Sequence, residues 1–302
     1  MGDVLAPWRV RVAPHLVDLT APVAVACSGG CDSVALLALA VDAALAPIAV
    51  HVDHGLRAGS HAEADVVAEV AHVLGAGFVA ARVDVPDGPN LEARARTARY
   101  AALDAARLDA GAAHVLVAHT ADDQAETVLL NVLRGAAADG LAGMARRNGT
   151  VVRPLLDLRR ADTRAICDEL GLTTVSDPMN DDARFRRVAI RREVLPLLAR
   201  LAERDLVPVL ARQADILRAE SDYLDAVATA AWPDADPPTT AALLALAPVV
   251  ARRALRAWLG HPRPSVAELE RVLRVVSGDA RRAELSGGRV VGRARGRLSL
   301  TR

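Results

Sequence analysis

The most constraining feature of the sequence is an alternation of short apolar runs with longer amphipathic stretches between residues 22 and 175. The apolar runs have the length of buried strands, and the stretches between them have the spacing of helices. Strands that alternate with helices are typical of a mostly parallel sheet with helices on both faces. In such sheets, ligands bind at the carboxyl ends of the strands. The sequence therefore predicts an α/β fold with its site at that edge.

The expected elements follow from this alternation. The predicted strands are residues 22–27, 48–52, 78–83, 113–118 and 151–153. The predicted helices that follow them are residues 32–46, 60–75, 90–110, 121–134 and 159–171. Beyond residue 187 the pattern is helical, with a long stretch over 193–230 that Pro196 and Pro208 interrupt. A linker over 232–238, two helices over 240–259 and 265–276, and a small β-meander within 283–300 complete the prediction.

These patterns divide the chain into a large first domain over residues 1–200, a helical connection and linker over 201–238, and a small domain over 239–302. A membrane span needs about 18 uninterrupted apolar residues, and Asp42 and Pro47 interrupt the best candidate stretch. The N-terminus has no apolar signal core, and three Cys do not suggest a disulfide scaffold. We therefore predict a cytoplasmic protein with no membrane partner.

All 37 basic residues of the chain are Arg. The lack of Lys excludes a Schiff-base lysine, a pyridoxal attachment site and a lysine phosphate clamp. The net charge is zero, but residues 252–302 contain 13 Arg against 4 acidic residues. Such a basic segment suggests a polyanionic partner, and it equally fits a face that only keeps the domain soluble.

The strongest local motif is Ser28-Gly29-Gly30-Cys31-Asp32-Ser33, between the first predicted strand and helix. Two glycines allow a tight turn and a close approach to a ligand, and a helix N-terminus favours an anion. Ser28 and Ser33 add hydroxyl donors, so the loop suits a phosphate or pyrophosphate. Asp32 beside phosphates requires a cation between them, which favours Mg²⁺ with a nucleotide. The sequence lacks both Gly-x-x-x-x-Gly-Lys and Gly-x-Gly-x-x-Gly.

Further motifs narrow the interpretation. They are His51–Arg57, Glu92–Tyr100, His119–Thr127, Leu133–Gly135, Gly140–Met144, Arg153–Leu155, Asp177–Asn180 and Ile190–Arg192. The first loop resembles the pyrophosphate loop of adenine-nucleotide hydrolase-like enzymes that cleave ATP to AMP and pyrophosphate. The order and spacing of all the motifs closely resemble the tRNA(Ile)-lysidine synthetase family, densely over residues 20–200 and loosely beyond.

The resemblance implies a fold, a reaction and partners. Residues 1–200 would form an ATP-pyrophosphatase catalytic domain, and residues 239–302 a small tRNA-contacting domain. ATP would activate C2 of the wobble cytidine in a tRNA(Ile) with a CAU anticodon. Free L-lysine would then attack C2 and expel AMP, which switches decoding from Met to Ile. The sequence does not fix the oligomeric state, and a homodimer is one option.

The resemblance also implies site residues. The residues expected to bind ATP are Ser28, Gly29, Gly30, Cys31, Asp32, Ser33, His54 and Arg99. Asp32 is also the expected ligand of Mg²⁺. The residues expected to act in catalysis are Asp32, Asp123, Glu126 and Arg191.

Asp123 and Glu126 make sense beside that resemblance. They are three residues apart on a predicted helix, so both carboxylates face one way. Such a pair next to a nucleotide can hold Mg²⁺ or an ammonium group, as a lysine-binding enzyme needs. Acids in a first helical turn also simply favour the helix dipole.

Residues 184–192 contain five Arg, a dense patch for phosphate contact. The family pattern here is Arg-Asn-x-Ile-Arg. Val188 stands where the family has Asn, whereas Arg191 matches the final Arg. A surface-exposed helix would also explain these Arg residues.

Two other functions stay open from the sequence alone. A tRNA thiolase of the same superfamily would need further Cys motifs, but Cys27 and Cys31 are wrongly spaced for a metal pair and only Cys167 remains. A non-catalytic adenine-nucleotide-binding protein would need neither the carboxylate pair nor the basic second domain.

Overall fold

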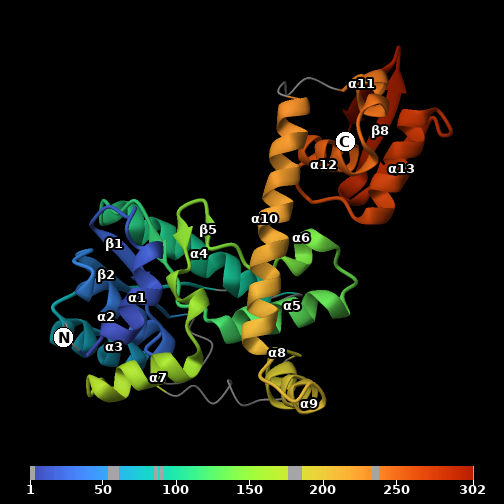
Figure 1. The fold of residues 1–302 in the computed structure, drawn as a ribbon. Coiled ribbons are helices and arrows are strands. Elements are labelled where there is room, and N and C mark those ends of the chain that lie inside the picture. Colours follow the sequence, from blue (N-terminus) through green and yellow to red (C-terminus); the bar gives the residue numbers. More distant parts are fainter. Residues whose placement is uncertain are drawn as a thin grey trace. The chain divides into compact units, whose positions relative to one another are not determined.

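The computed structural model describes residues 4–53, 61–84, 88, 91–175, 186–232 and 238–301. The chain divides into two compact units, Met1–Ile216 and Leu217–Arg302. The division falls within one continuous helix, α10 (Val207–Ala231), which Figure 1 shows in orange. The domain boundaries predicted from the sequence lie on either side of this helix.

The first unit contains a six-stranded sheet with the order β3-β2-β1-β4-β6-β5. Its strands are β1 (Val23–Ala26), β2 (Pro47–Asp53), β3 (Gly77–Arg82), β4 (Val115–Leu116), β5 (Arg147–Asn148) and β6 (Val151–Val152). All neighbours are parallel except β5, which pairs antiparallel with β6. The predicted mostly parallel sheet is confirmed. The strand order reverses between β1 and β4, and ligands bind at such a point in sheets of this kind.

Helices cover both faces of this sheet. The helices described before α10 are α1 (Ala6–Val12), α2 (Cys31–Asp42), α3 (His61–Leu74), α4 (Leu91–Asp109), α5 (Ala121–Leu133), α6 (Ala138–Leu141), α7 (Arg160–Glu169), α8 (Arg186–Ala189) and α9 (Leu195–Leu201). Shorter turns are η1 (Ala13–His15), η2 (Pro154–Asp157) and the π-helical turn η4 (Ile190–Val194).

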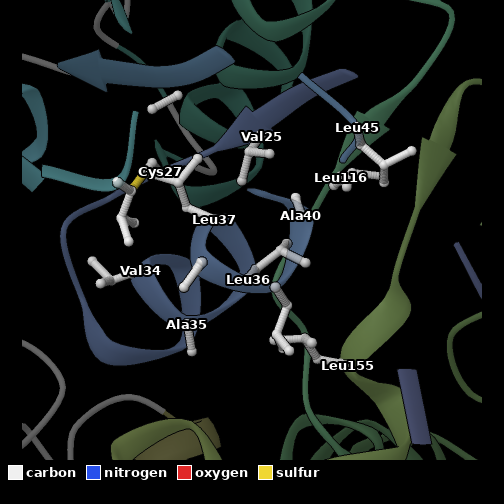
Figure 2. Close-up of a cluster of buried hydrophobic side chains, with 14 of the residues drawn as sticks. Val25, Cys27, Val34, Ala35, Leu36, Leu37, Ala40, Leu45, Leu116 and Leu155 are labelled. Atoms are coloured by element: carbon white, nitrogen blue, oxygen red, sulfur yellow. The ribbon is translucent and has the colours of Figure 1, made fainter. Parts of the chain in front are cut away.

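The period of two along β1 decides which helix covers which face. Val23 and Val25 pack into the cluster that contains α2, part of which Figure 2 shows. Ala24 points to the opposite face, where it belongs to a cluster with Leu103 and Ala106 of α4. A strand whose two faces are both apolar is typical of a parallel sheet buried on both sides.

Helix α2 is buried along most of its length. Residues 33–40 are all buried, and those from Val34 to Ala40 are all Val, Ala or Leu. A helix that is apolar all round belongs in a core, so α2 is held firmly behind the loop that precedes it. This packing fixes the position of Asp32 in its first turn.

The second unit joins helices to an antiparallel sheet with the order β7-β8-β9. Its elements after α10 are α11 (Thr240–Ala245), α12 (Pro248–Leu259), α13 (Val266–Ser277), β7 (Arg282–Leu285), η5 (Ser286–Gly288), β8 (Arg289–Ala294) and β9 (Arg297–Thr301). Leu255, Leu269 and Val272 are buried at its centre. The predicted β-meander is confirmed.

Proline explains where the predicted helices were wrong. The single helix expected over 240–259 is two helices, because Pro248 begins α12 and the residue before a proline disfavours helical geometry. Pro196 and Pro208 do not interrupt helices. Pro208 lies in the first turn of α10, where no intrahelical N–H bond is lost. Pro196 lies at the start of α9, directly after the π-helical turn η4, in a helical run that continues from residue 186 to 201. The break lies between them, at residues 202–206.

Glu268 ties α13 to the meander and gives a stability prediction. Its carboxylate accepts bonds from Ser265 N and Oγ, both at 2.7 Å, and from Ser286 N at 2.5 Å. The bonds from the backbone of Ser265 and Ser286 hold the pKa of Glu268 at about 2. We expect Glu268→Gln to lower the free energy of unfolding of this unit at pH 7 by about 1–3 kcal/mol, measured by chemical denaturation.

The sign of the pH dependence follows from the lowered pKa. The stabilisation is fully present above the ordinary pKa of 4.5 and is lost as the pH falls towards 2. The difference between wild type and variant should therefore shrink across that range. Glu270→Gln is the control, because Glu270 is about half exposed and pairs with Arg252 at the surface. Equal losses in the two variants would contradict this role of Glu268.

Candidate active site

The loop from Ser28 to Ser33 lies at the carboxyl end of β1 and leads into α2. Ser33 Oγ accepts a bond from Ser28 N at 3.2 Å and donates to Gly30 O at 2.9 Å. Ser28 Oγ lies 3.3 Å from Ser33 Oγ. These bonds hold the turn closed across its base, so the free N–H groups at the start of α2 face one place. Such a turn is a ready-made anion site.

Gly29 is the position in this loop that requires glycine. Its φ is +86°, and a Cβ there would lie 2.8 Å from Val175 Cγ2. Val175 N also donates to Gly29 O at 2.8 Å, which fixes the two segments against each other. We expect Gly29→Ala to raise the KM for ATP about tenfold or more, because the loop must shift.

Gly135 provides a control that has the strained backbone of Gly29 but not its close contact. Gly135 also has a positive φ, of +69°, but a Cβ there would meet nothing within 4 Å. We expect Gly135→Ala to share the conformational cost and to leave the KM for ATP near the wild-type value, measured by pyrophosphate release. An unchanged KM in Gly29→Ala would mean that the loop does not bind the nucleotide.

Asp32 connects the loop to α7. Thr163 Oγ1 donates to Asp32 Oδ1 at 2.5 Å, and Arg160 Nε lies 3.9 Å from Asp32 Oδ2. Burial raises the pKa of Asp32, the bond from Thr163 opposes that shift, and the nearby Asp123 adds to it. A carboxylate in this position gains from a cation beside it.

Asp123 lies in the first turn of α5, which follows β4. Its Oδ2 accepts bonds from Thr120 N at 2.9 Å and from Thr120 Oγ1 at 3.0 Å, as part of a capping box. Its Oδ1 accepts a bond from Arg160 Nη2. Burial alone would raise the pKa of Asp123, but Arg160, Thr120 and His119 outweigh burial and lower it. Asp123 is therefore a carboxylate at neutral pH.

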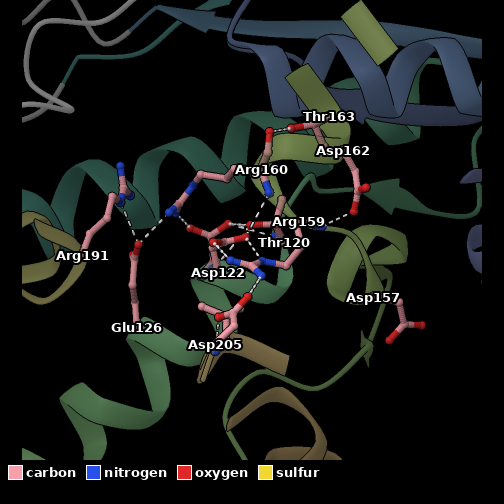
Figure 3. A network of polar contacts seen from close by, with 12 residues as sticks. Thr120, Asp122, Glu126, Asp157, Arg159, Arg160, Asp162, Thr163, Arg191 and Asp205 are labelled. Atoms are coloured by element: carbon pink, nitrogen blue, oxygen red, sulfur yellow. Dashed lines mark hydrogen bonds and ion pairs between the residues drawn. The ribbon is translucent and has the colours of Figure 1, made fainter. Parts of the chain in front are cut away.

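Glu126 is completely buried one turn further along α5. Its Oε1 accepts a bond from Arg160 Nη1 and a bond from Arg191 Nε, both at 2.8 Å, as Figure 3 shows. Its Oε2 has no hydrogen-bond partner within the described residues. A buried carboxylate oxygen without a donor is costly, and it is a natural acceptor for a ligand N–H.

Asp122 faces a different partner on the same turn. It accepts bonds from Arg159 Nε at 3.0 Å, Arg159 Nη2 at 3.1 Å and Arg160 N at 2.9 Å. Arg159 also binds Asp205, which precedes α10. Asp122 therefore holds the start of α7 against α5, and this contact delivers the Arg160 side chain to the acids.

His119 lies directly before the capping residue of α5. Arg153 Nε donates to His119 Nδ1 at 3.2 Å, so the ring proton is on Nε2. Burial, opposed by Asp123 and assisted by Arg153, lowers the pKa of His119 to about 4. The imidazole is therefore neutral at pH 7.

The structure brings together most of the residues singled out from the sequence. Asp32, Asp123 and Glu126 meet around the Arg160 guanidinium, and Arg191 reaches the same cluster through Glu126. Arg99 does not join this cluster. It lies on α4 beside Tyr100. Cys31 is the first residue of α2, and His54 lies outside the described residues.

Arg160 and Thr163 were not identified from the sequence. One signal could have found Arg160, because Arg159 and Arg160 stand where a predicted helix begins; no signal in the sequence identifies Thr163. Basic residues at that position oppose the helix dipole and so invite an acidic partner.

A family model described as a PP-loop domain matches residues 12–198. Over 308 aligned residues the chain is 44% identical to a protein named tRNA(Ile)-lysidine synthase from Nocardia farcinica, with 97% of this chain and 96% of that protein covered. The chain belongs to the tRNA(Ile)-lysidine synthase family. A lysidine synthase from Rhodococcus opacus is 48% identical, over 83% of this chain and 77% of its own length.

One solved structure has the same fold as the present chain. U34-tRNA thiolase NcsA from Methanococcus maripaludis, with its 4Fe-4S cluster, aligns with a TM-score of 0.58 and 16% identity, over 71% of this chain and 80% of that chain. At that identity the likeness concerns the fold alone. All three cysteines of the present chain are free, and Cys27 and Cys167 are buried.

The site fits a metal ion held by Asp32 and the substrate phosphates, and it does not fit a metal ion held by several protein side chains. The described residues contain no group of three or more His, Cys, Asp or Glu that could hold a metal ion. Mg²⁺ commonly takes only one or two carboxylates and completes its shell with substrate phosphates and water. Asp32 beside a phosphate-binding turn meets that requirement.

None of the described helices is long and apolar enough to cross a membrane.

Proposed function

We propose that this chain joins free L-lysine to C2 of the wobble cytidine of a tRNA(Ile) with a CAU anticodon, with conversion of ATP to AMP and pyrophosphate. The observation that carries the proposal is the meeting of Asp32, from the phosphate loop, with Asp123 and Glu126 of α5 around one guanidinium. A phosphate-binding turn thus adjoins carboxylates that already attract one cationic group, the Arg160 guanidinium, and a cationic substrate would be drawn to the same place. Relatives named tRNA(Ile)-lysidine synthase support this choice of substrates.

The loop from Ser28 to Ser33 binds the phosphates of ATP in this proposal. The hydroxyls of Ser28 and Ser33 and the N–H groups at the start of α2 supply neutral donors. Asp32 holds Mg²⁺, which when bound neutralises charge on the phosphates. Arg99 assists at the nucleotide. Since the chain has no Lys, any permanently charged side chain at the phosphates is an Arg.

The proposed reaction has two steps. The C2 carbonyl oxygen of the cytidine attacks the α-phosphate of ATP, and pyrophosphate leaves. The neutral ε-amine of lysine then attacks C2, the C2–O bond breaks, AMP leaves, and the attacking nitrogen gives one proton to solvent. The attacking ε-amine must be neutral, whereas the α-ammonium and α-carboxylate groups of lysine keep their charges.

Asp123 and Glu126 orient the lysine in this scheme. The lowered pKa of Asp123 makes it a weak base and a good partner for an ammonium group. Glu126 Oε2 supplies an acceptor that no described residue uses. Arg191 holds Glu126 in place and lies in the basic segment proposed to meet tRNA, together with the basic residues of the second unit.

The proposed function is tested by separating AMP from ATP by chromatography and measuring the AMP formed. With ATP and Mg²⁺, we expect AMP and pyrophosphate only when CAU-anticodon tRNA(Ile) is present, and one lysine attached to tRNA for each AMP. AMP release that needs a sulfur donor and not lysine would favour the thiolase function instead. Nucleotide binding without AMP under any condition would favour a non-catalytic binding protein. A cytoplasmic location and a homodimer stay predictions.

A further inference from the structure

Arg96 and Arg99 of α4 and Arg187 of α8 are three basic side chains for which the described residues show no paired acid. Arg96 lies over the ring of Tyr100, with 4.9 Å from its guanidinium carbon to the ring centroid, and Arg99 lies 5.7 Å from the same centroid. Arg96 Nη2 also donates to Tyr100 Oη at 3.4 Å. Arg187 of α8 donates to Thr127 Oγ1 of α5 at 3.4 Å. Among the described residues, no Asp or Glu pairs with any of these three Arg.

The topology places these side chains at the edge of the sheet where the site lies. The chain leaves β3 at its carboxyl end, enters α4, and returns to the amino end of β4. The first half of α4, which contains Arg96 and ends near Tyr100, therefore lies towards the carboxyl edge. Arg187 contacts α5 one turn beyond Asp123, at that same edge.

The charges act on one another. Burial lowers the pKa of Arg99, Tyr100 opposes that shift, and the neighbouring charges of Arg96 and Arg187 add to it. The same two charges also disfavour protonation of His119, which lies beside Asp123. Like charges that lie near one another, and that no described Asp or Glu pairs with, are stabilised by an anion.

We infer that Arg96 and Arg187, with Tyr100 positioning Arg96, bind the phosphodiester backbone of RNA beside the nucleotide that enters the site. The inference rests on the proposed function for the identity of the RNA. In the proposed function the phosphates of ATP are bound by the loop from Ser28 to Ser33 and by Arg99, so Arg96 and Arg187 are assigned to a different anion. Arg96 is exposed, and Arg–aromatic pairs suit single-stranded RNA, whose phosphates and splayed bases are both accessible.

Binding of tRNA at several salt concentrations tests the inference on the full chain. We expect Arg96→Gln and Arg187→Gln each to weaken the binding of a CAU-anticodon tRNA(Ile) transcript several-fold. Each should also reduce the slope of log K against log salt by about 0.7–1, the value for one lost phosphate contact. The KM for ATP should stay near wild type. Arg200→Gln, at an exposed position of α9, is the matched control and should leave the slope unchanged.

Tyr100 variants separate positioning from loss of fold. Tyr100→Phe keeps the ring beneath Arg96 and should bind tRNA almost as wild type, whereas Tyr100→Leu should weaken binding. Thermal unfolding of each variant shows whether the fold is kept. An unchanged salt slope in both Arg variants would overturn the inference, and a raised KM for ATP with an unchanged slope would assign these residues to the nucleotide instead.

The outcome is distinguishable from failure of the proposed function. If the wild-type protein forms no lysidine but the two Arg variants still change the salt slope, the proposed reaction fails and the RNA surface stands. If the wild type forms lysidine and the variants keep the slope, only the RNA surface fails.

Discussion

Asp32→Asn is expected to reduce lysidine formation and ATP-dependent pyrophosphate release by at least about 100-fold. The substitution keeps an oxygen that can accept the bond from Thr163 but removes the charge that would hold Mg²⁺ at the phosphates. The same change removes a negative charge that lies near Asp122 and Asp123. The temperature of unfolding should therefore stay at or slightly above the wild-type value.

The combination of lost activity and retained stability identifies a functional carboxylate. Asp168→Asn is the matched control, because Asp168 lies exposed on α7. It should leave both activity and stability near wild type. Activity of Asp32→Asn within a few-fold of wild type would contradict the assignment of Asp32 to the nucleotide and its metal.

Glu126→Gln is expected to lower both activity and stability. The carboxylate is fully buried and receives bonds from Arg160 and Arg191, so the neutral amide leaves two guanidinium groups without their shared counter-charge. Breaking a buried ion pair costs about 3–5 kcal/mol, and about 2 kcal/mol is expected here because both Arg side chains are partly exposed. The KM for lysine should rise about tenfold or more, measured by initial rates.

A double-mutant cycle that combines Glu126→Gln with Arg160→Gln measures the interaction energy of this ion pair. Because Arg160 Nη1 and Glu126 Oε1 are in direct contact, the two substitutions should be non-additive by about 0.5–3 kcal/mol in unfolding free energy. Glu169→Gln, at the exposed end of α7, is the control. A Glu126→Gln protein with the wild-type KM for lysine and wild-type stability would remove Glu126 from the site.

The fold was predictable where periodicity is local. The continuous apolar runs that predicted the strands near 22–27 and 48–52 are typical of strands buried on both faces. The structure confirms this burial for β1 and β2. Lengths were harder. Six residues were expected in the strand near 113–118, but β4 contains only Val115 and Leu116, since strand ends depend on the neighbouring strands and not on propensity.

The site was predictable where its residues share one helix. The spacing of Asp123 and Glu126 correctly predicted that they face one way, because helical geometry fixes it. The guanidinium that joins them comes from Arg160, 34 residues beyond Glu126, and the hydroxyl on Asp32 comes from Thr163, 131 residues away. No local rule connects such distant positions. Tertiary packing of α7 against α2 brings them together.

Attachment of radiolabelled lysine to tRNA tests the central claim most directly. The protein would be mixed with ATP, Mg²⁺, labelled L-lysine and a CAU-anticodon tRNA(Ile) transcript, with the methionine tRNA transcript, which has the same anticodon, as the control. We expect label on the isoleucine tRNA alone, in proportion to the AMP released. Absence of label on that tRNA, from folded protein that binds both ATP and tRNA, would contradict the account.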